Sequence, residues 1–178
     1  MTLDIKKLIK KKIKPFLIHF RKYSTSYEIP ELKTIVVNTC LGTELGKSEK
    51  FFEKSFEILS LITLQNPIII KAKKSVSNFK LREGDFIALL CNLHYLKMYR
   101  FLANLLFLTL PQVEDWFIKS KNLDNDCNLN LGIDEHLVFP EIGFAYSGKP
   151  FGLNINISFK TIKNKKDNAI LIKMLNLI

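Results

Sequence analysis

The residues best suited to binding chemistry lie between positions 66 and 84, in the segment NPIIIKAKKSVSNFKLREG. It contains five cations and no acid before position 83: Lys71, Lys73, Lys74, Lys80 and Arg82. Hydroxyl and amide donors (Ser75, Ser77, Asn78) accompany them, and Phe79 offers a ring. Cations neutralise phosphates, and hydroxyl and amide groups orient the contact. The segment therefore predicts an RNA-binding site, with a solvated hairpin whose lysines serve solubility as the alternative.

Two predicted strands flank this segment. Ile68 to Ile70 is expected to form a buried strand before it, and Phe86 to Leu96 a buried strand after Gly84. A helix from Met98 to Leu110 should follow, stopped by Pro111. The cations are thus expected to be held between core elements.

The rest of the chain predicts further strands and helices without a regular alternation. The expected elements are strands Thr34 to Asn38 and Asn154 to Phe159, helices Ser48 to Leu64 and Asp167 to Leu177, and a loop from Asn122 to Asn130. We therefore expect an α+β fold, a mostly antiparallel sheet layered with helices. The length of 178 residues predicts a single domain, residues 1–178.

Residues 1–22 predict a basic amphipathic helix. Apolar residues recur at helical spacing opposite the lysines, at Leu3, Ile5, Leu8, Ile9 and Ile13. Pro15 should end or kink this helix. A helix retained in the domain is the favoured interpretation; a cleaved mitochondrial targeting peptide and a membrane-surface helix are the alternatives.

Composition indicates a polyanionic partner and an AT-rich genome. The net charge is +10, and only three of the 27 Lys and Arg residues are arginine. In the most apolar region, Phe86 to Val113, charged Lys97 and Arg100 interrupt the uncharged runs, so no membrane insertion is expected.

Neither catalysis nor a metal or cofactor is expected. His19, His94 and His136 are scattered, and no nucleotide-binding or nucleophile motif occurs. His94 is expected to be a satisfied core or interface residue. The cysteines, at positions 40, 91 and 127, form no CxxC pair, and we expect them to be reduced and mostly buried.

Several short segments recur in an order typical of one known family. They are Asn38 and Gly42, Pro67, the run from Lys71 to Gly84, Met98 and Tyr99, Phe101 and Leu102, Leu110 and Pro111, GIDEHLVFPEI from Gly132 to Ile142, and Gly152 and Leu153. In this order the chain resembles the large-subunit ribosomal protein family called L-five, the 5S rRNA binder. The likeness covers nearly the whole length, although the segment from Asp115 to Asn130 and Cys40 depart from the family pattern.

The resemblance implies a structural protein of the central protuberance. Its partners would be 5S rRNA, large-subunit rRNA, the peptidyl-site tRNA, neighbouring protuberance proteins and a small-subunit head protein of the S-thirteen family. By this analogy the RNA-binding residues are Asn38, Lys71, Lys73, Lys74, Ser75, Asn78, Phe79, Lys80 and Arg82. Asn38 is expected to follow a strand and precede a loop, with a turn-capping role as the alternative. For Phe79, packing is favoured over stacking. A mitochondrial ribosome is expected, with another organellar or a bacterial ribosome as the alternative.

Overall fold

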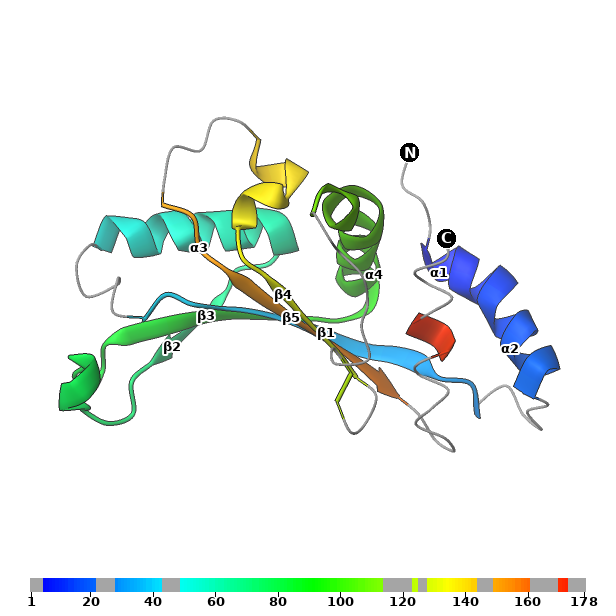
Figure 1. The fold of residues 1–178 in the computed structure, drawn as a ribbon, viewed down its shortest axis with the longest axis horizontal. Coiled ribbons are helices and arrows are strands. Elements are labelled where there is room, and N and C mark those ends of the chain that lie inside the picture. Colours follow the sequence, from blue (N-terminus) through cyan, green and yellow to red (C-terminus); the bar gives the residue numbers. More distant parts are fainter. Residues whose placement is uncertain are drawn as a thin grey trace. The chain divides into compact units, whose positions relative to one another are not determined.

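A five-stranded sheet forms the centre of the computed structural model, with the strand order β2-β3-β1-β5-β4 (Figure 1). The structure describes residues 5–21, 28–42, 49–113, 123–124, 128–143, 149–160 and 170–172. The sheet is antiparallel and is accompanied by helices, so the predicted α+β class is confirmed.

Four of the five strands agree with the sequence pattern to within a few residues; the strand at Leu129–Ile133 was not predicted, and its first two residues lie in the segment that was expected to be a loop. They are β1 (Glu31–Cys40), β2 (Ile68–Lys71), β3 (Phe86–Leu93), β4 (Leu129–Ile133) and β5 (Leu153–Lys160). In β5 buried and more exposed residues alternate along the whole strand, as the period-2 pattern predicted. In β1, however, the strand extends beyond both ends of the predicted segment.

The helices also match, with one exception near the N-terminus. The longer ones are α2 (Lys14–Arg21), α3 (Glu49–Thr63) and α4 (Tyr95–Asn104); α1 (Ile5–Leu8) and the π-helical η1 (Ile9–Ile13) precede α2, and η5 (Leu105–Thr109) and η6 (Leu110–Gln112) follow α4. Short 3₁₀ turns are η4 (Ser77–Phe79), η8 (His136–Val138) and η9 (Pro140–Ile142). Of the predicted C-terminal helix, residues 170–172 are described and helical.

Pro15 does not end the N-terminal helix, so of the predicted end or kink the end is wrong. α2 starts at Lys14 and continues to Arg21, directly after the π-helical segment. Proline lacks an N–H, and this loss costs nothing in the first turn of a helix, where that group has no intrahelical partner. Pro15 therefore occupies the start of a new α-helical segment.

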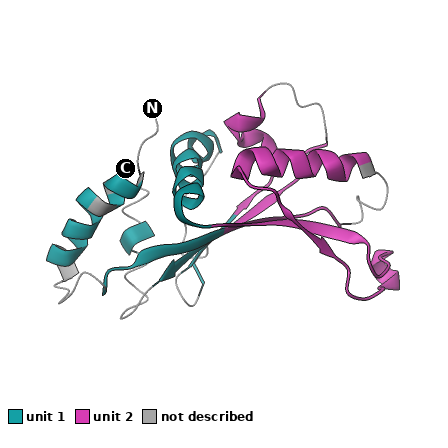
Figure 2. Cartoon of the chain, turned by 180° about the vertical axis from the view of Figure 1, so that it is seen from behind, with its two compact units in different colours: residues 1–35, 94–131, 156–178 teal, residues 36–93, 132–155 magenta. Residues whose placement is uncertain are grey.

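The chain divides into two compact units (Figure 2): residues 1–35, 94–131 and 156–178 form unit 1, and residues 36–93 and 132–155 form unit 2. In unit 1, α1 contacts α4. Ile9, Ile13 and Leu17 are buried there, whereas Lys6 and Lys11 are exposed. Of the predicted apolar face, Ile9 and Ile13 are thus buried, which favours a retained domain helix over a membrane-surface helix, whereas the side chains of Leu3, Ile5 and Leu8 lie outside the described part of the chain.

In unit 2, α3 packs on β3. The buried side chains of α3 include Leu59 and Ile62, and those of β3 include Leu89, Cys91 and Leu93. The Thr63 hydroxyl at the end of α3 lies 3.4 Å from the Cys91 sulfur. This helix anchors the strand from which the basic segment departs.

One prediction of burial, that of β2, was wrong, and the prediction that the cysteines are mostly buried holds for Cys91 only among those that the structure describes. β2 is a strand, but Ile68, Ile69 and Ile70 are 54%, 39% and 39% exposed, because β2 is the edge strand of the sheet and has only one strand neighbour. Cys40 is exposed at the end of β1, whereas Cys91 is buried as expected; position 127 lies outside the described residues. Across the described helices, none is long and apolar enough to cross a membrane.

Candidate nucleic-acid interface

The basic segment is the end of an antiparallel hairpin formed by β2 and β3. Ile68 pairs with Leu90, Ile70 with Ala88 and Lys71 with Phe86, so that Ile87 forms a bulge. A bulge shifts the side-chain alternation by one residue, and this brings the Phe86 side chain onto the face that α3 covers. There its ring stacks on that of Phe52, with centroids 4.9 Å apart and an interplanar angle of 16°.

Backbone hydrogen bonds continue beyond the two strands. The Ala72 N–H donates to the Asp85 carbonyl at 2.8 Å, and the Gly84 N–H donates to the Ala72 carbonyl at 3.0 Å. Val76 and Leu81 exchange both of their backbone bonds, at 3.0 and 3.2 Å. We call residues 71–85 the basic hairpin. Its backbone is a paired ladder and not an open loop.

At the tip, η4 reverses the chain. The Lys80 N–H donates to the Ser77 carbonyl at 3.0 Å, and Lys80 has φ +52°, in the left-handed region. That conformation is uncommon for a residue with a side chain. It turns the chain from the 3₁₀ helix back towards Leu81.

Two side chains fix the base of the basic hairpin. The Ser75 hydroxyl accepts a hydrogen bond from the Glu83 N–H at 2.9 Å, and one Asp85 carboxylate oxygen accepts one from the Arg82 N–H at 2.7 Å. Ser75 therefore has a structural role in addition to the predicted RNA contact. Sequence reasoning missed Asp85, whose carboxylate reaches back three residues to the Arg82 N–H.

The cations of the basic hairpin all face solvent. Lys71, Lys73, Lys74, Lys80 and Arg82 are exposed, and no acid among the described residues forms a salt bridge with them. The Lys71 ammonium lies 5.3 Å from the centroid of the Phe86 ring. These positive charges can therefore attract and bind an external polyanion.

Phe79 is 64% exposed, which contradicts the prediction that it packs. It lies at the end of η4, where no described element covers it, and Asn78 beside it is also exposed. An exposed ring between cations is suited to stacking on a base.

Asn38 lies within β1 and not after it, which corrects its predicted position. Val37 and Thr39 are buried on one face of the strand, and Asn38 points to the other face. Its side-chain oxygen is buried and has no hydrogen-bond partner among the described residues. The turn-capping alternative is therefore wrong, because the residue is part of the sheet.

Two further asparagines lie, like Asn38, on the side of the sheet opposite the buried rows of their strands. Asn92 of β3 and Asn154 of β5 lie between buried residues along their strands, on the side that the buried rows do not occupy. In unit 2 this sheet face therefore presents amides from three strands. The sequence signal for this polar face is the recurrence of asparagine two residues apart, at positions 154 and 156.

The histidines form no catalytic arrangement. His136 is buried; its Nδ1 accepts a hydrogen bond from the Phe151 N–H at 3.1 Å, and its ring stacks on that of Phe151 with centroids 4.0 Å apart. Burial lowers the pKa of His136, and the Phe151 backbone and the Glu135 charge oppose this effect without outweighing it. His94 is exposed before α4, so of the predicted core or interface role the core role is wrong and the interface role stays a prediction.

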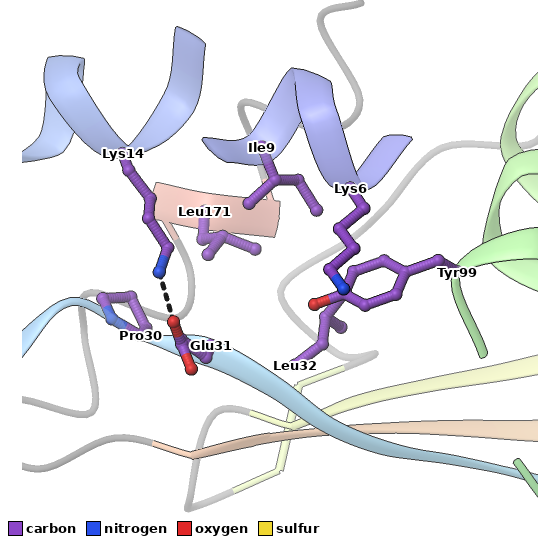
Figure 3. A pocket seen from close by; sticks show the side chains of 8 residues that line it. All are labelled: Lys6, Ile9, Lys14, Pro30, Glu31, Leu32, Tyr99 and Leu171. Atoms are coloured by element: carbon purple, nitrogen blue, oxygen red, sulfur yellow. Dashed lines mark hydrogen bonds and ion pairs between the residues drawn. The ribbon is translucent and has the colours of Figure 1, made fainter. Parts of the chain in front are cut away.

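A pocket of about 240 Å³ in unit 1 has both polar and apolar walls (Figure 3). It is lined by Lys6, Ile9, Lys14, Pro30, Glu31, Leu32, Tyr99 and Leu171. Lys14 forms an ion pair with Glu31, and the Lys6 ammonium lies 5.9 Å from the centroid of the Tyr99 ring. Burial, followed by the Glu31 charge, raises the pKa of Tyr99. The charged groups of this pocket thus already interact with other residues that line it.

No cluster of three or more His, Cys, Asp or Glu side chains suited to a metal ion occurs in the described part of the chain. The basic hairpin itself offers five exposed cations, the Asn78 amide and the exposed Phe79 ring. All nine RNA-binding residues predicted from the sequence lie in unit 2.

Comparison with known proteins identifies similar sequences along almost the whole chain. Residues 26–82 match the family "Ribosomal protein L5", and residues 86–177 match the model for the C-terminus of the same ribosomal family. The chain is 42% identical to "Large ribosomal subunit protein uL5c" of Cyanidium caldarium, over 88% of this chain and 86% of the relative. It is 41% identical to "Large ribosomal subunit protein uL5" of Desulforapulum autotrophicum, over 95% and 94% of the two chains. The identity to the uL5c protein of Rhodomonas salina is 35%, over 99% and 97%.

Proposed function

Since this chain belongs to the ribosomal protein L5 family, we propose that its basic hairpin binds the phosphate backbone of rRNA. The family assigns it to the large ribosomal subunit, with rRNA as its partner and a structural role in translation. It is not an enzyme.

The observation that carries the proposal is the combination of exposed charge with a fixed backbone. Lys73, Lys74 and Arg82 are exposed on a hairpin whose backbone is held by paired hydrogen bonds and by the Ser75 and Asp85 side chains. A segment that is ordered before it binds loses less conformational entropy in the complex. The hairpin can therefore use most of its electrostatic attraction for affinity.

The nine predicted residues have three roles in this proposal. Lys71, Lys73, Lys74, Lys80 and Arg82 contact phosphates; Ser75, Asn78 and Asn38 orient the RNA as hydrogen-bonding groups; Phe79 stacks on an unpaired base. Asn38 acts from the sheet face together with Asn92 and Asn154, whereas the others act from the basic hairpin.

We also propose individual RNA and protein partners. We assign 5S rRNA and large-subunit rRNA to unit 2, and the peptidyl-site tRNA to the tip of the basic hairpin. The neighbours are central-protuberance proteins and a small-subunit head protein of the S-thirteen family. These partners follow from the resemblance, and the exposed, cationic tip is compatible with a tRNA backbone.

The ribosome itself is of organellar or bacterial type, because similar proteins are chloroplast or bacterial. The mitochondrial location expected from the sequence stays a prediction. Fractionation of the source cells followed by detection of the native protein distinguishes a mitochondrial from a plastid or bacterial ribosome.

Ultraviolet crosslinking of the native protein in sedimentation fractions tests the proposal. We expect the protein in large-subunit fractions, with crosslinks from residues 71–85 to 5S and large-subunit rRNA. Crosslinks to large-subunit rRNA alone would remove 5S rRNA from the proposal. Large-subunit sedimentation with crosslinks that avoid residues 71–85 altogether would contradict the assigned site, while leaving family membership intact.

A further inference from the structure

A second exposed aromatic and cationic cluster lies at the start of α4, in unit 1 and outside the basic hairpin. Tyr95 is 87% exposed and Leu96 is 77% exposed, the two largest exposures among the described large apolar side chains. Tyr95 also has φ +50°. We infer that this turn binds an unpaired rRNA nucleotide, with the base stacked on the Tyr95 ring; the inference rests on the proposed function.

The backbone at Tyr95 is unfavourable for a tyrosine. The left-handed region brings the Cβ atom close to the carbonyl oxygen, and bulky residues rarely occupy it. Glycine would adopt this conformation without that cost. Burial of the ring does not offset this conformational cost, because almost all of the Tyr95 side chain faces solvent. A strained backbone at an exposed aromatic residue is typical of a functional site and therefore indicates a binding role for Tyr95.

The ring of Tyr95 has an aromatic neighbour. The His94 ring lies with its centroid 6.4 Å from that of Tyr95, at an interplanar angle of 51°. His94 is itself exposed. The two rings offer an aromatic surface to a planar ligand, and unpaired bases in RNA stack on tyrosine and histidine rings.

Cations continue this surface along the helix. Lys97 and Arg100 are exposed and three residues apart, a spacing that places them side by side on a helix. The first turn of α4 contains no acid. The opposite face of the helix, with Met98, Phe101 and Leu102, is buried in the core. No acid in the part of the chain that the structure describes forms a salt bridge with Lys97 or Arg100, so the exposed face combines rings with positive charge.

This combination favours RNA over a protein as the occupant. An apolar protein partner would cover Leu96 and Tyr95 but would have to pair or desolvate two cations. An RNA segment uses both features, because its bases stack on the rings while the adjacent phosphates contact Lys97 and Arg100. The first turn of α4 is therefore a second RNA contact.

The test uses the chain of 178 residues and a transcript of the large-subunit rRNA from the same source. Tyr95→Gly should lower the affinity about tenfold, because it removes the stacking ring, and should leave the melting temperature equal or higher, because glycine relieves the backbone. Tyr95→Trp, which keeps a large ring, should retain the affinity. Lys97→Glu should weaken binding more than Lys54→Glu, which makes the same charge change at an exposed position of α3.

Crosslink mapping gives the second readout. We expect a crosslink from Tyr95 to an unpaired rRNA nucleotide in assembled subunits. A Tyr95→Gly protein with unchanged affinity, or a Tyr95 crosslink to another protein instead of RNA, would overturn the inference. If charge reversal of the basic hairpin weakens rRNA binding in the same assay, only the α4 contact has failed; if neither change has an effect, the proposed function has failed as well.

Discussion

His136 connects the stability of unit 2 to pH through a single buried ring. Burial lowers the pKa of this histidine, so the folded protein keeps it neutral at a pH where the unfolded chain already binds a proton. Its contribution to stability is therefore complete above about pH 6.5, the ordinary value for histidine, and decreases as the pH falls towards the folded pKa. Protonation of Nδ1 would also remove the acceptor of the Phe151 N–H.

We predict that the free energy of unfolding of the wild-type protein decreases between pH 7 and pH 5 more steeply than that of His136→Phe. Phenylalanine keeps a ring against Phe151 but has no titrating group. Urea unfolding at several pH values measures both slopes, and His19→Phe, at an exposed position, is the control. Parallel slopes for wild type and His136→Phe would contradict a lowered pKa.

At the residue scale, the sequence predicted the cations better than the other site residues. Long charged side chains are almost always exposed, so Lys73 and Arg82 needed no structural context. Phe79 and His94 were misplaced because their burial depends on which element lies opposite them, and Asn38 was misplaced because β1 continues two residues beyond the predicted end. A single sequence does not contain that information.

At the element scale, the basic hairpin depends on contacts that hold its backbone in place. The Asp85 carboxylate accepts the Arg82 N–H, whereas the Glu83 side chain is exposed and its backbone N–H, not its carboxylate, bonds to Ser75. The two acids thus have equal charge but different structural roles, and this makes them a matched pair for mutation.

We predict that Asp85→Ala weakens rRNA binding about two- to fivefold, because the hairpin must be ordered on binding. Loss of a negative charge alone would strengthen binding, as we expect for Glu83→Ala. Filter binding at one salt concentration compares the two variants with wild type. If both variants bind rRNA more tightly, charge alone governs the contact and the fixed backbone has no role.

The elements themselves were largely predictable, because apolar periodicity and turn residues are local signals. The strands β3 and β5 and the helices α3 and α4 appear close to their predicted positions. Pro15 was misread because its effect depends on its position within the helix, and the π-helical segment before it is not visible in the sequence. The burial of β2 was misread because the strand order of the sheet decides which strand is the edge.

At the scale of the whole molecule, the net charge of +10 and the family agree on a polyanionic partner. Fold class and family were predictable, because many ordered motifs extend over nearly the full length. That the 178 residues fold as one domain stays a prediction. Charge alone does not locate a binding site, because lysines are spread over both units.

The measurement that tests the basic hairpin most directly is the salt dependence of rRNA affinity for two triple variants. Lys73→Glu, Lys74→Glu and Arg82→Glu together reverse three hairpin charges. Lys33→Glu, Lys50→Glu and Lys54→Glu together make the same charge change at exposed positions of β1 and α3. Five phosphate contacts correspond to a log–log salt slope of roughly −4, and each lost contact removes roughly 0.7 to 0.9 from it. We predict weaker binding and a slope of roughly −2 for the hairpin variant, with the wild-type slope retained by the control. Equal slopes for the two variants would show that net charge, and not the basic hairpin, holds the RNA.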